Sequence, residues 1–190
     1  MTEPQRAGID WDADSDTVAR QLIGVTLLVN GVGGTIVETE AYDRDDAASH
    51  SFGGPTRRNL VMFGPPAHAY VYLSHGIHWC LNFVCREPGH GAGVLIRALA
   101  PETGIDRMIE RRGTPDLRKL CSGPGKLAQA LGITHAMNGA DLAASPFVLL
   151  APAQRVDVLA GPRIGISKAI EVPWRFGLAG SPYLSRPMKG

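Results

Sequence analysis

Short runs of apolar and β-branched residues, separated by turn-forming residues, constrain the fold of this chain more than any other feature. Four such runs form two pairs, at residues 25–29 with 35–39 and at residues 69–73 with 77–85. The first pair is joined by Asn30-Gly31-Val32-Gly33-Gly34 and the second by Ser74-His75-Gly76, and both connections are typical of β-hairpins. Connections this short require antiparallel pairing, because a parallel pair needs a crossover of about a dozen residues.

The remaining segments extend this sheet and cover it with helices. Strands are predicted at residues 93–100, 147–150, 156–160, 163–166 and 175–178, and helices at residues 15–22, 104–112 and 125–131. Residues 43–66 form a long polar loop. A loop of this length inside a compact domain is usually functional or disordered, and we interpret this one as functional. We predict a mixed α/β (α+β) fold in a single domain: a mainly antiparallel, curved β-sheet with surrounding helices and a protruding β-hairpin. Residues 1–13 are predicted to be a flexible acidic arm, and residues 14–190 the domain.

Composition and cysteine usage exclude several classes of protein. No apolar run reaches the roughly 18 residues of a membrane span, and the acidic N-terminus lacks the pattern of a signal peptide. Cys80, Cys85 and Cys121 are too few and too irregularly spaced for a disulfide framework. We therefore expect an intracellular protein, cytoplasmic or nucleoid-associated, without membrane contact. No feature indicates an obligate protein partner, so we expect a monomer.

Charge is distributed unevenly along the chain. Residues 1–103 hold 7 Lys and Arg against 12 Asp and Glu, whereas residues 104–190 hold 12 against 6. A net charge of +1 does not by itself indicate a polyanionic partner, and scattered solvated charge explains the same numbers. The asymmetry nevertheless permits a local basic face, which is all that phosphate binding needs.

Glu40 is the strongest candidate for a catalytic group. It lies near the end of an apolar strand, just before the long polar loop, where a carboxylate can be held rigidly and still reach a substrate. Alternation along the strand places Glu38, Glu40 and Tyr42 on one face. Arg97 interrupts another apolar strand and needs a buried partner, and it could keep Glu40 ionised. A salt-bridged structural acid remains the alternative for Glu38 and for Glu40.

Aromatic and histidine side chains are concentrated in the first half of the chain. Such rings stack on nucleobases and suit a pocket for an extruded base, whereas packing in the core is the alternative for each one. The members of this set are Tyr42, His50, Tyr70, Tyr72, His75, His78 and Trp79.

Metal and phosphate-loop chemistry are not supported by the spacing of the residues. His75 faces away from His78 and Cys80 along a strand, and no second pair completes a tetrahedral zinc site. The segment from Cys121 to Lys126 lacks the spacing of a phosphate-binding loop. A helix N-terminus touching one phosphate is the better interpretation. We expect no metal and no cofactor.

Several short motifs, taken in order, closely resemble the alkyladenine (3-methyladenine, or methylpurine) DNA glycosylase family. The resemblance runs from about Ala19 to Ser185, and it is the order and spacing of the motifs that make it specific. The matching motifs are Val37-Glu38-Thr39-Glu40-Ala41-Tyr42, Ser49-His50, Arg58-Asn59, Met62-Phe63, Tyr70-Val71-Tyr72, Gly76, Asn82, Leu95-Ile96-Arg97-Ala98-Leu99, Leu120-Cys121-Ser122-Gly123-Pro124-Gly125-Lys126-Leu127 and Gly180-Ser181-Pro182-Tyr183.

The resemblance implies a role for each matching position. Glu40 would activate the attacking water, and Arg97 would help to hold that water and the carboxylate. The base pocket would comprise Tyr42, His50 and Tyr72, with Asn82 excluding the 2-amino group of guanine. The fold is expected to resemble the C-terminal domain of methionyl-tRNA formyltransferase.

The resemblance also implies how the protein would meet double-stranded DNA containing damaged purines. His75 stands where better-known members carry a tyrosine that wedges into the DNA stack, and imidazole offers less apolar area for that purpose. Lys126 and Arg58 are candidates for DNA-phosphate contacts.

The expected reaction flips a damaged purine out of the duplex and hydrolyses its N-glycosidic bond, leaving an abasic site. The substrates would be of the 3-methyladenine, hypoxanthine and ethenoadenine class. No lysine is placed to form a Schiff base, so no lyase activity is expected. Two alternatives remain open: a non-catalytic nucleic-acid-binding module of the same fold, and a hydrolase of small nucleosides.

Overall fold

One eight-stranded antiparallel sheet organises the molecule, and the long strand β2 (Val32–Tyr42) lies at its centre. The computed structural model describes residues 5–188. Strand order is β3-β4-β5-β2-β1-β6, and β8 pairs with β2 and with β7. The other strands are β1 (Thr26–Val29), β3 (Ala69–Ser74), β4 (His78–Cys85), β5 (Ala92–Thr103), β6 (Phe147–Leu150), β7 (Val158–Gly161) and β8 (Arg175–Leu178). The predicted single-domain α+β fold around a curved antiparallel sheet is confirmed.

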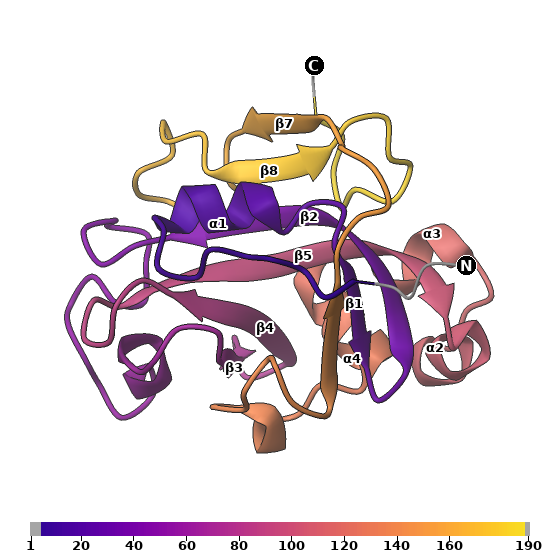
Figure 1. Ribbon diagram of the computed structural model, residues 1–190, viewed down its shortest axis with the longest axis horizontal. Coiled ribbons are helices and arrows are strands. Elements are labelled where there is room, and N and C mark those ends of the chain that lie inside the picture. The colour runs from indigo at the N-terminus through magenta and orange to yellow at the C-terminus, as the bar shows by residue number, and fades with distance from the viewer. Residues whose placement is uncertain (1–4, 189–190) are drawn as a thin grey trace.

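In Figure 1, α1 lies over β2, whereas α2, α3 and α4 gather toward the right. α1 contacts β2 and β5, whereas α4 contacts β4 and β5, and α2 packs against α4. The helices are α1 (Ser15–Gln21), α2 (Ile105–Arg112), α3 (Leu117–Leu120) and α4 (Pro124–Leu131), with 3₁₀ turns η1 (Leu60–Phe63) and η2 (His135–Met137). The three predicted helices are thus present, and α3 is an addition. Among the helices of residues 5–188, none is long and apolar enough to cross a membrane.

The β1–β2 hairpin is tighter than the sequence predicted. Its turn consists of Asn30 and Gly31 alone, both with positive φ (50° and 74°), and this is the geometry of the two-residue turns that match strand twist. Gly33 and Gly34, predicted to lie in the connection, belong to β2 instead. A Cβ on Gly33 would lie 1.9 Å from the Leu27 carbonyl oxygen. These glycines therefore permit close backbone approach and do not form the turn.

Substituting Gly33 with alanine is expected to lower the free energy of unfolding by about 3 kcal/mol, because the strands must separate to admit the new methyl group. Gly53→Ala is the matched control, since a Cβ at that position would meet nothing within 4 Å and surface changes usually cost less than about 0.5 kcal/mol. Chemical denaturation of both variants measures the difference. Equal stabilities would contradict the close approach.

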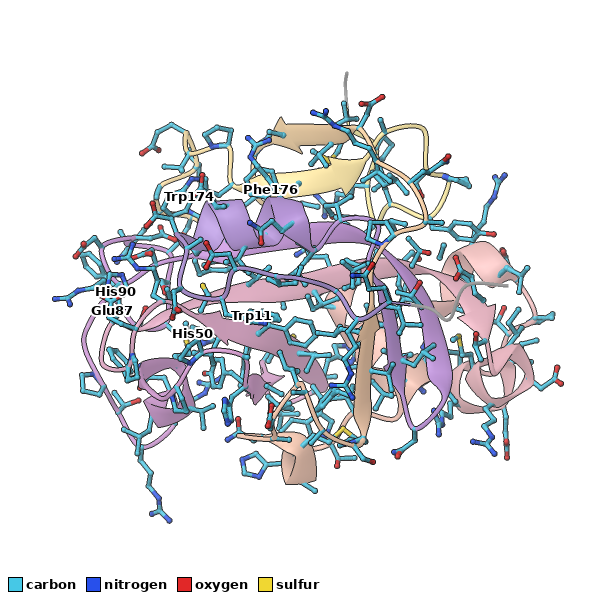
Figure 2. All side chains as sticks on the ribbon, viewed as in Figure 1. Trp11, His50, Glu87, His90, Trp174 and Phe176 are labelled. Atoms are coloured by element: carbon cyan, nitrogen blue, oxygen red, sulfur yellow. The ribbon has the colours of Figure 1, made fainter. Side chains whose placement is uncertain are left out.

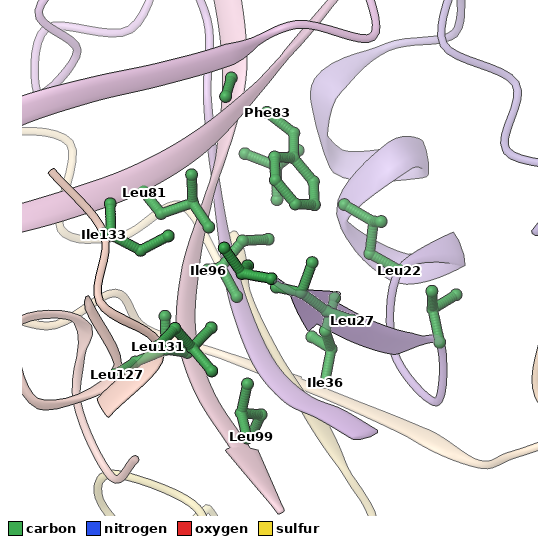
Figure 3. Packing of buried hydrophobic residues seen from close by; sticks show 14 of the residues in the cluster. Leu22, Leu27, Ile36, Leu81, Phe83, Ile96, Leu99, Leu127, Leu131 and Ile133 are labelled. Atoms are coloured by element: carbon green, nitrogen blue, oxygen red, sulfur yellow. The ribbon is translucent and has the colours of Figure 1, made fainter. Parts of the chain in front are cut away.

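The apolar core is continuous and joins α1 and α4 to the strands (Figure 3). Leu22, at the end of α1, and Leu127 and Leu131 of α4 are fully or almost fully buried. They pack with strand residues that include Leu27, Ile36, Leu81, Phe83, Ile96 and Leu99. This packing makes the sheet a rigid platform for the side chains on its other face.

Residues 5–13 pack along the domain. Arg6 forms an isolated β-bridge with Leu150, and the Ala7 amide donates to the Leu149 carbonyl. Trp11 lies beside β4 in Figure 2 and packs edge-on against Phe83, with ring centroids 6.0 Å apart. The predicted arm also includes residues 1–4, which lie outside the described residues, and its flexibility stays a prediction.

The segment predicted as a strand at residues 163–166 is not one. It forms a bend after β7, and the Ile164 amide donates to the Glu40 carboxylate over 2.7 Å. Its apolar residues Ile164 and Ile166 line a cavity, and its backbone bonds to a side chain in place of a strand ladder.

Candidate active site

Alternation along the strands places the core on one face of the sheet and a cavity of about 600 Å³ on the other. The core face carries Val71, Leu81, Phe83, Val94 and Ile96. The residues that alternate with them, Tyr70, Tyr72, Cys80, Asn82, Leu95 and Arg97, line the cavity. Three neighbouring strands therefore supply one wall of the site.

The structure brings together most of the residues predicted for the site. Those that line the cavity are Tyr42, His50, Arg58, Tyr72, His75, Asn82 and Arg97. Glu40 does not line the cavity: it is fully buried and is bonded to Tyr42 and Arg97, which do. Lys126 does not line the cavity and is exposed on α4, the helix whose first residue, Pro124, does line it. Tyr42 and Ile164, which are 122 residues apart in the sequence, both line this cavity.

Glu40 is held by three donors that belong to the cavity wall. One carboxylate oxygen accepts from the Ile164 amide (2.7 Å). The other accepts from the Tyr42 hydroxyl (2.9 Å) and from Nη1 of Arg97 (3.2 Å). An ionised carboxylate has about four acceptor positions, so these three bonds leave one of them unused, and Tyr42, Arg97 and Ile164 connect Glu40 to the cavity that they line. This arrangement fits a rigidly oriented general base.

The proton affinity of Glu40 reflects opposing influences. Burial raises the pKa of its carboxyl, and Arg97, the Ile164 amide and the Tyr42 hydroxyl lower it without cancelling the effect of burial. Burial also raises the pKa of the Tyr42 phenol, and the neighbouring Glu40 carboxylate raises it further. Tyr42 consequently acts as a neutral hydrogen-bond donor to Glu40, whose carboxyl has a raised pKa.

Two arginines and two glutamates form a buried ionic cluster at the base of the site. Arg97 donates from Nε to Glu38 (3.0 Å) and from Nη1 to Glu40 (3.2 Å). Arg175 donates from Nε to the same oxygen of Glu38 (2.8 Å). All four side chains are at least 90% buried, and their formal charges cancel. This balance offsets the cost of removing four charges from water.

Aromatic rings cluster on one side of the cavity, where His50 joins two tyrosines of the strand wall. The rings of His50 and Tyr72 meet edge to face, with centroids 4.5 Å apart. The rings of Tyr70 and Tyr72 stack, with centroids 5.4 Å apart. His50, labelled in Figure 2, comes from the long loop, and Nδ2 of buried Asn59 anchors that loop by donating to the His50 carbonyl over 2.7 Å. Burial lowers the pKa of the His50 imidazole and raises the pKa of Tyr70 to about 12. These rings are therefore uncharged at neutral pH.

Asn82 lies on the cavity wall with its side-chain orientation fixed. It is 7% exposed, and its Nδ2 donates to the Tyr70 carbonyl of the adjacent strand over 3.2 Å. A side chain anchored in this way resists displacement, so it can exclude a ligand group by contact.

The tip of the β3–β4 hairpin lies at the rim of the cavity. His75 and Gly76 have positive φ (49° and 71°) and form the turn. His75 lines the cavity, and Ile77 beside it is 70% exposed. Arg58 is attached to this hairpin through a bond from Nη2 to the Leu73 carbonyl (2.9 Å). The rim thus combines an imidazole, an exposed aliphatic side chain and a cation.

Several residues of the site were missed by sequence reasoning. Ile164 acts through its backbone, which leaves no signal in a side-chain pattern. Arg163 is buried, forms an ion pair with Asp46, and lies 4.8 Å from the Tyr42 ring centroid. An arginine within the apolar run 163–166 is a signal of the same kind as Arg97. Ser185, whose hydroxyl donates to Glu38, lies in a coil, and the sequence around it has no pattern that indicates this role.

Comparisons with known proteins agree with this geometry. Residues 10–182 match the sequence profile of the family described as methylpurine-DNA glycosylase. A Nitrosospira multiformis protein named "Putative 3-methyladenine DNA glycosylase" is 66% identical over 189 residues, covering 100% of this chain and 96% of its own. Proteins of the same name from Rhodopseudomonas palustris (strain BisB18) and Rhizobium meliloti are 62% and 60% identical. The matched regions cover 90% and 89% of this chain, and 85% and 90% of the length of the two relatives, respectively.

Proposed function

The chain belongs to the methylpurine-DNA glycosylase family, and on this premise we propose that it flips damaged purines out of duplex DNA and hydrolyses their N-glycosidic bond. The buried Glu40–Arg97 pair at the wall of an aromatic cavity carries this proposal. The substrates include 3-methyladenine, hypoxanthine and ethenoadenine, and the products are the free base and an abasic site.

The cavity suits an extruded purine. Tyr42, His50 and Tyr72 offer ring faces and edges for stacking, and such contacts tolerate different bases because every base has a π face. Anchored Asn82 provides exclusion, because the 2-amino group of guanine would meet a side chain that cannot move aside. Selection thus combines general stacking with one specific steric block.

Glu40 serves two purposes in the proposed reaction. Its carboxylate accepts a proton from the attacking water, and its negative charge stabilises the oxocarbenium-like transition state at C1′ of the sugar. Arg97 keeps the carboxylate ionised and oriented. A cationic base such as 3-methyladenine leaves readily without a second acid, in contrast to the usual pair of acids in glycosidases.

The reaction is proposed to end at an abasic site without strand cleavage. Within residues 5–188, no lysine lines the cavity, so the amine that a Schiff base requires does not reach the sugar. Strand nicking by the purified protein that borohydride traps as a covalent adduct would contradict this part of the proposal.

DNA contacts are proposed at the rim of the cavity. His75 would enter the space that the flipped base vacates, with exposed Ile77 adding the apolar area that an imidazole lacks. Arg58 and Lys126 would contact phosphates. Five aspartates of the first half of the chain line a separate cavity: Asp14, Asp16, Asp43, Asp45 and Asp46. None of these five lines the aromatic cavity.

Replacing Lys126 with alanine is expected to weaken binding of damaged and undamaged duplexes about equally, and to reduce the slope of log K against log salt by about 1. Arg44→Ala is the control, because Arg44 is exposed beside Asp45 of the acidic cavity. Binding isotherms at several salt concentrations measure the slopes. An unchanged slope for Lys126→Ala would remove Lys126 from the interface.

Activity is expected to depend on the ionisation of Glu40. Because burial raises the pKa of this carboxyl above its ordinary value of 4.5, the general base is protonated and inactive at acid pH. The single-turnover rate should therefore rise with pH, with an apparent pKa above 4.5. Measuring that rate at saturating protein on one neutral lesion tests the expectation. A rate that stays constant down to pH 4.5 would contradict the role of Glu40 as a base.

The defining experiment uses duplex oligonucleotides that each contain one 3-methyladenine, hypoxanthine or ethenoadenine. Alkali-dependent breaks at the lesion, absent from undamaged duplex, support the proposal. Binding of these duplexes without any product favours a non-catalytic nucleic-acid-binding module of the same fold. Turnover of free nucleosides but not of duplex DNA favours a small-nucleoside hydrolase.

A further inference from the structure

Glu38 receives more hydrogen bonds than its place in the proposed reaction explains. It is completely buried, and one of its oxygens accepts from Nε of Arg97 (3.0 Å), Nε of Arg175 (2.8 Å) and Oγ of Ser185 (2.7 Å). Its other oxygen accepts from the Ser185 amide. These four hydrogen bonds hold both oxygens of Glu38, and Glu38 does not line the cavity, so it is not placed to act as a base.

Arg97 lies at a bulge between β2 and β5, and Glu38 holds its side chain there. In the register, Glu38 pairs with Ala98 and Thr39 pairs with Ile96, so Arg97 has no partner opposite it. Bulges of this kind redirect side chains. The long arginine side chain is flexible by itself, and within residues 5–188 its Nε bonds to Glu38 while its Nη1 bonds to Glu40. Fixing Nε fixes the plane of the guanidinium and therefore the direction of Nη1.

The segment after β8 completes this arrangement. Ser185 supplies both of its donors to Glu38, and its Oγ is 3.4 Å from Nη2 of Arg97. The next residue, Arg186, accepts from Arg175 through its carbonyl. Gly177 makes room for the segment, because a Cβ there would lie 2.5 Å from the sulfur of Met188. The coil is therefore docked on the sheet beneath the site.

We propose that Glu38 and Ser185 are a positioning pair for the glycosylase reaction: they hold the Arg97 guanidinium in the orientation that presents Nη1 to Glu40. The inference rests on the proposed function and extends it to the C-terminal segment. Neither residue touches the substrate. Their effect reaches the chemistry only through Arg97.

Single-turnover excision separates positioning from general stability. Ser185→Ala is expected to slow excision about 10-fold and Glu38→Gln about 100-fold, because small displacements of catalytic groups cost rates of this order. Affinity for lesion-containing duplex should stay within about twofold of the wild type, since the ring-lined cavity is unchanged. Ser185→Thr keeps the hydroxyl and should therefore retain most of the wild-type excision rate. Ser181→Ala is the matched control, because Ser181 lies in the same segment and its hydroxyl bonds to the Tyr183 amide.

Rates of Ser185→Ala and Glu38→Gln equal to that of the wild type would overturn the inference, as would parallel losses of rate, affinity and melting temperature. The Nε–H signal of Arg97 in the free, ¹⁵N-labelled protein provides a test that needs no turnover. We expect its hydrogen exchange with water to be slow in the wild type and in Ser181→Ala and faster in Ser185→Ala. Equal exchange in all three also overturns the inference. A wild type that excises no lesion refutes the proposed function, whereas an active wild type with unaffected variants refutes only the positioning pair.

Discussion

Replacing Glu40 with glutamine is expected to slow base excision by about 10²- to 10⁴-fold, the usual contribution of a general base. The amide has nearly the same shape but cannot accept a proton from water, and it cannot offset positive charge on the sugar. Affinity for lesion-containing duplex should be retained, because stacking in the cavity and phosphate contacts do not use this carboxylate. Single-turnover excision and equilibrium binding, measured on the same duplex, separate the two effects.

Glu102→Gln is the matched control for this substitution. Glu102 is exposed at the end of β5, and its carboxylate accepts from the Thr35 hydroxyl (2.7 Å), away from the cavity. Its excision rate should equal that of the wild type. If Glu40→Gln excised damaged bases at the wild-type rate, Glu40 would be a structural acid and another group would have to activate the water.

Replacing Arg97 with methionine is expected to affect both stability and activity. Methionine fills part of the volume but leaves Glu38 without one of its two arginines and Glu40 without its only ion-pair partner among residues 5–188. Removing one member of a buried ion pair costs about 3–5 kcal/mol. Chemical denaturation should show a loss of this size.

The activity of Arg97→Met should depend on pH in a defined direction. Burial raises the pKa of Glu40 and Arg97 lowers it, so loss of the arginine raises that pKa further. A larger fraction of Glu40 is then protonated at any given pH. The apparent pKa at which the single-turnover rate rises should therefore be higher than in the wild type. Arg97→Lys is the control: it keeps one positive charge, but as a single point donor it bridges two carboxylates less well. An apparent pKa that is unchanged in Arg97→Met would show that Arg97 does not control the ionisation of Glu40.

The periodicity of the sequence was sufficient to predict the sheet and the face on which the chemistry lies. Alternation from Val37 to Tyr42 placed Glu38, Glu40 and Tyr42 together, and in the structure Arg97 contacts both acids. The reason is that strand geometry has a period of two, so neighbours in sequence alternate faces whatever surrounds them. An arginine within an apolar strand likewise had to find a buried partner.

Tertiary structure alone decided how that chemistry is held. Gly33 and Gly34 look like turn residues in the sequence, and only the distance between strands shows that they admit close approach. The Ile164 amide reaches Glu40 from 124 residues away, and the Ser185 hydroxyl reaches Glu38 from 147 residues away. Backbone donors and coil residues carry no periodic signal, because their role depends on where the whole chain brings them. The sequence therefore determined which side chains can react, and the fold determined which of their atoms are fixed by others and which remain free.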